Sequence, residues 1–195
     1  MDEKWHRAAV WGLAAVMPLL IVSAVITMAV NFQPLYEYGF NQYEVSSVTG
    51  LPPSELEHIA EELIDYFNSD RDFIDITAVK DGQPFSLFNE REIIHLYDVK
   101  GLIQLNYNVL AGSIIYAGLV YLMPRHRRQP RLTAPGLFWG GSLTLAAVLA
   151  LAAAAVIDFN AFFTQFHIIS FANDLWLLDP ATDYLIMLFP SGFWR

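Results

Sequence analysis

Three long apolar segments alternate with polar stretches along the chain. They run from Ala8 to Val30, from Leu102 to Met123 and roughly from Gly136 to Ile157. Each holds about 20 residues, and a helix of that length spans about 30 Å, the thickness of a bilayer's hydrocarbon core. The pattern predicts three transmembrane helices. We expect the first to be retained, because its apolar run exceeds the roughly 7 to 15 residues of a signal-peptide core.

These helices predict a mainly α, polytopic membrane protein with a small extracytoplasmic α/β cap and a C-terminal interfacial helical segment. We expect transmembrane helix 1 at 1–30, an acidic extracytoplasmic domain at 31–101, helix 2 at 102–123, a basic cytoplasmic loop at 124–135, helix 3 at 136–157 and the interfacial segment at 158–195. The outer domain is too small for a large core of its own, so we expect one structural unit.

Basic residues set the expected orientation. They crowd the loop between helices 2 and 3, at Arg125, His126, Arg127, Arg128 and Arg131, and cytoplasmic loops are rich in Lys and Arg. The acidic segment 31–101 is then outside, and with a net charge of -9 the chain disfavours nucleic acid as a partner. The absence of cysteine excludes disulfides and thiolate metal sites.

Local patterns predict four further features. An amphipathic helix is expected over SELEHIAEELIDYFN, and two short strands are expected near 74–80 and 84–88 with a turn at Asp81-Gly82. Asn89 is placed to cap a helix that continues into transmembrane helix 2. The small side chains of the Ala-rich stretch 146–155 are expected to allow close helix approach.

The segment from Phe159 to about Leu178 carries polar residues within an apolar sequence. On a helical wheel Asn160, Thr164, His167 and Asp174 form one narrow stripe. Crossing the bilayer would bury these groups, at about 2.5 to 3.5 kcal/mol for a central charged residue. We therefore expect this segment to lie at the outer surface, with the stripe facing a pocket.

Two histidines are the candidates for chemistry. His95 lies three residues before Asp98, which could orient its ring, and we expect it within about 10 Å of His167. Each also has a simpler interpretation, as an interfacial histidine beside an acid and as a satisfied buried histidine, respectively. The chain lacks an HExxH motif and offers only these two well-placed histidines, so no metal is expected. The other histidines, His6, His58 and His126, are not expected to act.

Specific motifs give the chain a resemblance. HLYDVK at His95 to Lys100, followed by FHIISFANDLWLLDPATDYLIMLFPSGFW, resembles the bacterial lipoprotein intramolecular transacylases over nearly the whole sequence. The resemblance implies transfer of the sn-2 acyl chain of an S-diacylglyceryl N-terminal cysteine to that cysteine's α-amino group, giving a lyso-form lipoprotein. It also implies that His95 and His167 are catalytic. The family's fourth membrane helix is expected to be absent or truncated, because the sequence stops at Arg195.

This chemistry suits a pair of imidazoles. One histidine would act as base and its partner as acid, without an assignment of which, while Asp98 and Asp174 would orient the rings and Asn173 would stabilise an oxyanion. Candidate substrate-binding residues are Lys100, Phe163, Phe166 and Trp176. No cofactor is expected.

The expected partners are diacylated bacterial lipoproteins and membrane lipid. The expected location is the bacterial cytoplasmic membrane, with the active site at the extracytoplasmic face. Two alternatives remain open. One is a non-enzymatic membrane sensor or assembly protein. The other is a lipid ester hydrolase or intermolecular acyltransferase that uses the same histidine pair.

Overall fold

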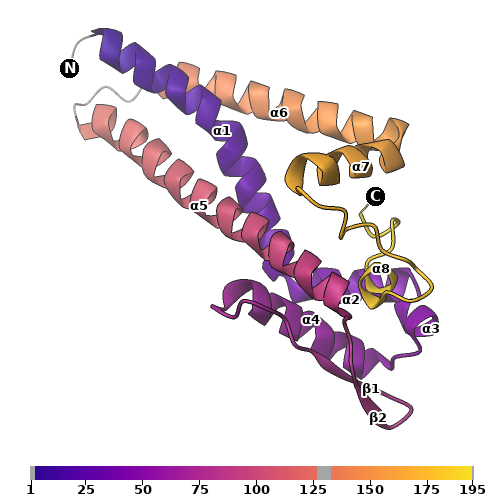
Figure 1. Ribbon diagram of the computed structural model, residues 1–195. Coiled ribbons are helices and arrows are strands. Elements are labelled where there is room, and N and C mark those ends of the chain that lie inside the picture. Colours follow the sequence, from indigo (N-terminus) through magenta and orange to yellow (C-terminus); the bar gives the residue numbers. More distant parts are fainter. Residues whose placement is uncertain (1–2, 127–132, 195) are drawn as a thin grey trace. The chain divides into compact units, whose positions relative to one another are not determined.

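The structure is a computed structural model that describes residues 3–126 and 133–194. Positions 127–132 of the expected basic loop lie outside the described residues. The elements are α1 (Glu3–Asn31), α2 (Gln33–Gln42), α3 (Val45–Thr49), α4 (Pro53–Asn68), β1 (Thr77–Lys80), β2 (Gln83–Ser86), α5 (Glu90–His126), α6 (Ala134–Ile157), α7 (Phe159–Ser170) and α8 (Tyr184–Leu188) (Figure 1). The mainly helical fold expected from the sequence is confirmed.

The chain divides into two compact units, where the sequence led us to expect one. The helical unit comprises Met1–Met28 and Leu105–Ile157, and the mixed unit comprises Ala29–Gln104 and Asp158–Arg195. The expectation rested on the small size of segment 31–101 taken alone. The C-terminal segment joins it, and together they bury a core that includes Ile59, Tyr66 and Leu188, each with an exposed fraction of 0%.

Three helices are long and apolar enough to cross a membrane, as the sequence predicts: Arg7–Asn31, Glu90–Leu122 and Ala134–Ile157. Many of their large apolar side chains face outward; Ile157, for example, is 84% exposed. Exposure of large apolar side chains is favourable in the hydrocarbon core of a bilayer and unfavourable in water. A helix suits that core because it satisfies its backbone hydrogen bonds internally. α5 has 37 residues, more than the roughly 20 needed to span, so it extends beyond the hydrocarbon core.

Close approach of helices in the helical unit depends on glycine. A Cβ added to Gly136 would lie 2.6 Å from the Val10 carbonyl oxygen, and one added to Gly140 would lie 2.6 Å from the Met17 Cγ. The four-residue spacing of these glycines is the small-residue pattern that lets membrane helices approach closely. α6 therefore packs on α1 through this glycine pair, whereas the Ala-rich stretch 146–155 is mostly exposed, contrary to expectation.

The mixed unit is built around α4. This helix starts at Pro53, whose ring suits a first helical position, and it buries Leu56, Ile59 and Leu63 on one face. β1 and β2 pair antiparallel across Asp81-Gly82, and both turn residues have positive φ, of 53° and 76°. Such a turn matches the twist of a two-residue hairpin, so the predicted hairpin is confirmed.

The N-terminus of α5 is fixed by a reciprocal capping pair. The Asn89 side chain accepts a hydrogen bond from the Glu92 backbone N–H at 3.1 Å, and the Glu92 carboxylate accepts one from the Asn89 N–H at 2.8 Å. The predicted cap is therefore confirmed. The other carboxylate oxygen accepts the Leu185 N–H at 2.7 Å. Glu92 is 1% exposed, so this carboxylate ties the start of α5 to the start of α8 from inside the mixed unit.

Replacing Glu92 by Ala should lower the thermal stability of the detergent-solubilised protein. The change leaves the buried Leu185 N–H and the part-buried Asn89 N–H without their acceptor, at about 1 to 3 kcal/mol for the buried group and less for the other. The melting temperature should fall by roughly 5 to 10 °C. Glu90→Ala is the matched control, because Glu90 lies in the same turn and is exposed. Equal melting temperatures of the two variants would contradict the proposed tie.

Candidate active site

His95 and His167 lie side by side in the mixed unit. His95 belongs to the second turn of α5 and His167 to the last turn of α7. Their ring centroids are 6.1 Å apart with a 31° angle between the planes, and each residue is 6% exposed. The prediction of an approach within about 10 Å is confirmed. The two motifs, separated by two apolar helices in sequence, thus meet in one buried place.

Aromatic rings surround His167. Its ring centroid lies 4.1 Å from that of Phe163, 5.1 Å from that of Phe166 and 4.8 Å from that of Trp176. These are three of the residues that the sequence suggested for substrate binding. They form a wall of low polarity against the imidazole, which weakens competition from water for any hydrogen bond made there.

Phe171 completes the enclosure, and sequence reasoning missed it. Its ring lies 5.0 Å from His95 and 5.5 Å from His167, and it is 9% exposed. α7 ends at Ser170, and Phe171 adopts an extended conformation with φ -124° and ψ 138°. The motif FHIISFAND that carries the resemblance includes Phe171, but the residue becomes central only when the chain turns back toward α5.

A hydrogen bond fixes the tautomer of His167. Its Nδ1 lies 2.7 Å from the Phe163 carbonyl oxygen, and since a carbonyl only accepts, Nδ1 carries the hydrogen. In the neutral ring Nε2 then holds a free lone pair. Burial lowers the pKa of His167 from its ordinary value of 6.5, and the bond to Phe163 opposes this shift more weakly. His167 is therefore a neutral imidazole whose Nε2 can accept a proton.

His95 offers the complementary feature, a polar atom that is buried and unpaired. Within the described residues its Nδ1 has no hydrogen-bond partner. Asp98, expected to orient this ring, instead accepts a hydrogen bond from the Asn173 side-chain amide at 2.8 Å. Buried polar atoms without partners are rare in native structures and need a reason. A group of a bound substrate would satisfy this one.

The segment after α7 is a loop, where we expected the helix to continue to about Leu178. The Asn173 side chain accepts the Leu175 N–H at 3.1 Å, a local bond that competes with helix formation. Asp174 therefore leaves the polar stripe, and only Asn160, Thr164 and His167 share α7. With 12 residues α7 is also too short to cross a bilayer, in agreement with the expected surface location.

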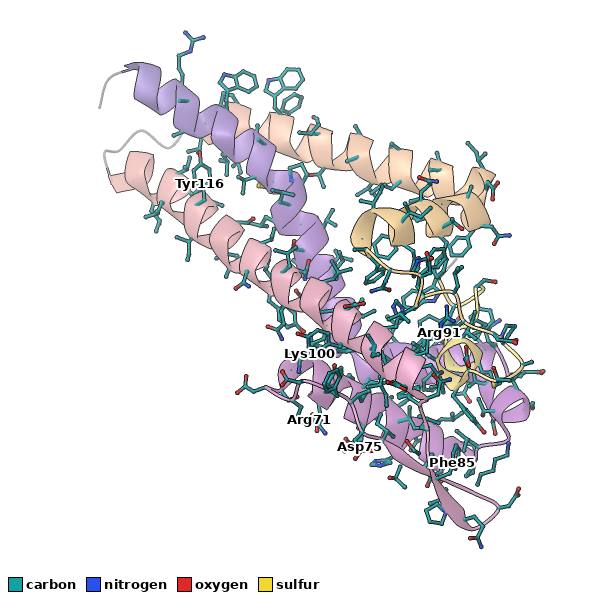
Figure 2. All side chains as sticks on the ribbon, viewed as in Figure 1. Arg71, Asp75, Phe85, Arg91, Lys100 and Tyr116 are labelled. Carbon is teal, nitrogen blue, oxygen red and sulfur yellow. The ribbon has the colours of Figure 1, made fainter. Side chains whose placement is uncertain are left out.

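Arg91 anchors this loop to α5, a role that sequence reasoning did not find. Its Nη2 donates to the Asp174 carbonyl at 2.6 Å and its Nε to the Leu175 carbonyl at 3.4 Å. Figure 2 shows Arg91 at the start of α5, beside the C-terminal segment. Together with the pair of Asp98 and Asn173, it holds the loop that carries Trp176 against His167.

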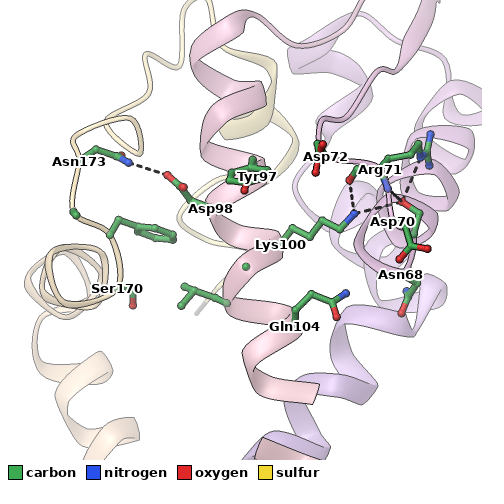
Figure 3. A pocket seen from close by; sticks show the side chains of 15 residues that line it. Asn68, Asp70, Arg71, Asp72, Tyr97, Asp98, Lys100, Gln104, Ser170 and Asn173 are labelled. Atoms are coloured by element: carbon green, nitrogen blue, oxygen red, sulfur yellow. Dashed lines mark hydrogen bonds between the residues drawn. The ribbon is translucent and has the colours of Figure 1, made fainter. Parts of the chain in front are cut away.

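Lys100, a suggested substrate-binding residue, is engaged within the protein. Its ammonium donates to the Arg71 carbonyl at 2.6 Å (Figure 3). It also lies 4.4 Å from the centre of the Tyr66 ring. These contacts hold the loop after α4 against α5.

The described residues contain no group of three or more His, Cys, Asp or Glu that could hold a metal ion.

Comparisons with known proteins agree on one family. The family model "Lipoprotein intramolecular transacylase Lit" matches residues 11–194. The chain is similar to the structure of the membrane-integral Lit from Bacillus cereus, with 23% identity, a TM-score of 0.80, and coverage of 99% of this chain and 85% of that one. A form of that protein with a histidine-to-arginine mutation matches at 22% identity, a TM-score of 0.74, and coverage of 98% and 81%. No curated protein matches the sequence.

Phe171→Ala should expose both imidazole rings of the pair to diethyl pyrocarbonate, because the Phe171 ring lies against each. Mass spectrometry of the modified peptides gives the reaction rates of His95 and His167, and exposed His58 supplies the reference rate. We expect both rates to rise severalfold relative to His58.

The control for this experiment is Phe73→Ala. It removes a 57% exposed ring that packs on Tyr97 and makes no ring contact with either histidine of the pair. Unchanged reactivity in the Phe171 variant, or an equal rise in the control, would refute the enclosure.

Proposed function

Because this chain belongs to the lipoprotein intramolecular transacylase Lit family, whose members are acyltransferases, we propose that it moves an acyl chain within one lipoprotein molecule. The acyl chain leaves the sn-2 position of an S-diacylglyceryl N-terminal cysteine and joins the α-amino group of that cysteine. The product is a lyso-form lipoprotein. The observation that carries the proposal is the buried imidazole pair with rings 6.1 Å apart.

His167 acts as the base in this mechanism. Its Nδ1–H is held by the Phe163 carbonyl, so Nε2 keeps a lone pair that can accept a proton. The substrate's ammonium first loses one proton to solvent. The neutral amine attacks the ester carbonyl, and as the N–C bond forms, Nε2 removes a second proton and passes it to the departing glycerol oxygen as the C–O bond breaks. Atoms and protons balance without a further reactant.

His95 acts as a hydrogen-bond donor to the ester. A buried imidazole favours its neutral form, which carries one N–H. The ring lies beside His167, and in the proposed mechanism its N–H binds the carbonyl oxygen as negative charge develops; removing one such donor typically costs 10² to 10³ in rate. The Nδ1, which has no hydrogen-bond partner among the described residues, supports this role, because a bound substrate could supply one.

Asp98, Asn173 and Asp174 then position the loop. The Asn173 amide bonds Asp98, and the Asp174 carbonyl accepts from Arg91, which keeps Trp176 and Phe171 around the imidazole pair. A second N–H of the Asn173 amide remains as an additional oxyanion donor. Phe163, Phe166 and Trp176 supply the apolar wall for the glycerol and the start of the acyl chain.

Intramolecular transfer suits this enclosed site. Effective molarities of well-oriented intramolecular reactions reach about 10⁵ M or more, so holding one substrate in place supplies much of the rate. Exclusion of water from two residues that are each 6% exposed favours transfer to the amine over ester hydrolysis. Neither a cofactor nor a metal is required.

The proposed location is the bacterial cytoplasmic membrane, with the site at its extracytoplasmic face. The basic residues between α5 and α6 favour a cytoplasmic position for that connection. An odd number of crossings then returns the chain to the outside before α7. The substrates there are diacylated lipoproteins embedded in membrane lipid.

His95→Ala and His167→Ala should each abolish formation of the lyso-form, because each removes one half of the pair. His6→Ala, His58→Ala and His126→Ala should retain wild-type activity. The measurement is mass spectrometry of a lipoprotein's N-terminal peptide after expression in cells that lack lipoprotein N-acylation. Wild-type conversion by either of the first two variants, at equal expression, would show that the imidazole pair does not carry the reaction.

The transfer rate should rise about six- to eightfold between about pH 6.5 and about pH 7.5. In this range only the substrate's ammonium, with a reference pKa of about 7.7 to 8.0, titrates. His167 is already neutral there, because burial lowers its pKa below the ordinary 6.5. Initial rates on a purified diacylated lipopeptide give the profile. A second break at or above about pH 6.5 would show that His167 titrates in the working range and is not the buried base.

A further inference from the structure

A polar cavity of about 650 Å³ lies beside the histidine pair, within the mixed unit. Three segments form it: the loop after α4, the second to fourth turns of α5 and the loop after α7. Figure 3 shows Asp72 and Lys100 on one side of α5 and Asp98 with Asn173 on the other. The mechanism described above uses Phe171, Asp98 and Asn173 from its wall but places no part of the substrate in the cavity.

Part of the cavity wall is the backbone of α5 at Gly101, which no side chain covers. A Cβ added to Gly101 would meet no atom within 4 Å, and the residue is exposed. Glycine inside a helix costs about 1 kcal/mol relative to alanine, so the open space above it calls for an explanation. Close approach of another backbone to the helix is the usual reason for such a glycine.

The cavity is connected to the reacting centre through one side chain. Phe171 is part of the cavity wall, and its ring lies 5.0 Å from His95 and 5.5 Å from His167. A molecule with its reactive group at the histidines therefore extends naturally into the cavity. Since the lining is largely polar, the part that enters is neither of the acyl chains.

The charges of the lining argue against a phosphate headgroup. Both of its cations are engaged internally: Lys100 bonds the Arg71 carbonyl, and the Arg71 guanidinium pairs with Glu62 at 3.6 Å. The carboxylates of Asp70 and Asp72, by contrast, accept no hydrogen bond within the described residues. Carboxylates and amides are suited to the N–H and C=O groups of a polypeptide backbone.

We propose that this cavity holds the first residues of the lipoprotein polypeptide that follow the modified cysteine, with their backbone laid across Gly101. The inference rests on the proposed function, since it assumes that the cysteine's amino group is at the histidine pair. It makes the peptide, in addition to the lipid, a determinant of which substrates are processed.

Two synthetic substrates test the proposal with the full chain in lipid-detergent micelles. Both carry S-diacylglyceryl cysteine; one has a single residue after it and the other about six, which extend to about 20 Å. The ratio of kcat/KM for the long substrate to that for the short one is measured by mass spectrometry. For the wild type we expect the ratio to exceed about ten, the effect of about 1.4 kcal/mol of added binding.

Gly101→Leu places a side chain in the cavity and should bring this ratio close to one. Gly112→Leu is the matched control, because Gly112 is also an exposed α5 glycine with open space around it and does not line the cavity. It should keep the wild-type ratio. Equal kcat/KM for both substrates in the wild type, or equal ratios in the two variants, would overturn the peptide site alone. Failure of the wild type to convert either substrate would overturn the proposed function and this inference with it.

Discussion

The histidine pair depends on hydrogen bonds that tie the start of α5 to the C-terminal segment. Glu92 is a buried carboxylate with backbone partners on both sides, Asn89 within its own helix turn and Leu185 in the far segment. His95 lies one helical turn after Glu92, beside the loop that the C-terminal segment forms. A buried carboxylate is costly unless it is fully hydrogen-bonded, so this arrangement strongly favours a single register between the two segments.

The fixed register lets the loop after α7 serve as a rigid wall of the site. The loop after α7 has little regular structure, yet Arg91 bonds two of its carbonyls and Asp98 bonds its Asn173 side chain. Anchored in this way, it can hold Phe171 and Trp176 against the imidazoles. Catalytic groups work best when neighbouring packing fixes their geometry, and here both walls and both imidazoles belong to the mixed unit.

Burial gives the pair its chemical character. An imidazole in water titrates near pH 6.5, whereas an enclosed ring stays neutral to lower pH and keeps a lone pair available for an amine's proton. Enclosure also restricts water, which would otherwise compete with the amine for the ester. In the proposed mechanism the same aromatic walls therefore favour the base and protect the ester from hydrolysis, as an acyl transfer between two groups of one substrate requires.

The sequence by itself determined the features that depend on local pattern. Apolar length predicted the three membrane helices, the Asp81-Gly82 pair predicted the hairpin, and Asn89 predicted the start of α5, because each is governed by neighbouring residues. The motifs around His95 and His167 likewise identified the family, whose model matches residues 11–194.

The tertiary structure decided everything that depends on how distant segments meet. It placed Phe171 against both histidines, paired Asp98 with Asn173 rather than with His95, and engaged Lys100 with a loop carbonyl. It also ended α7 at Ser170, which removed Asp174 from the expected stripe, and joined the outer segment to the C-terminal one in a single core. These outcomes follow from competition among hydrogen-bond partners and packing surfaces far apart in sequence, which no local pattern records.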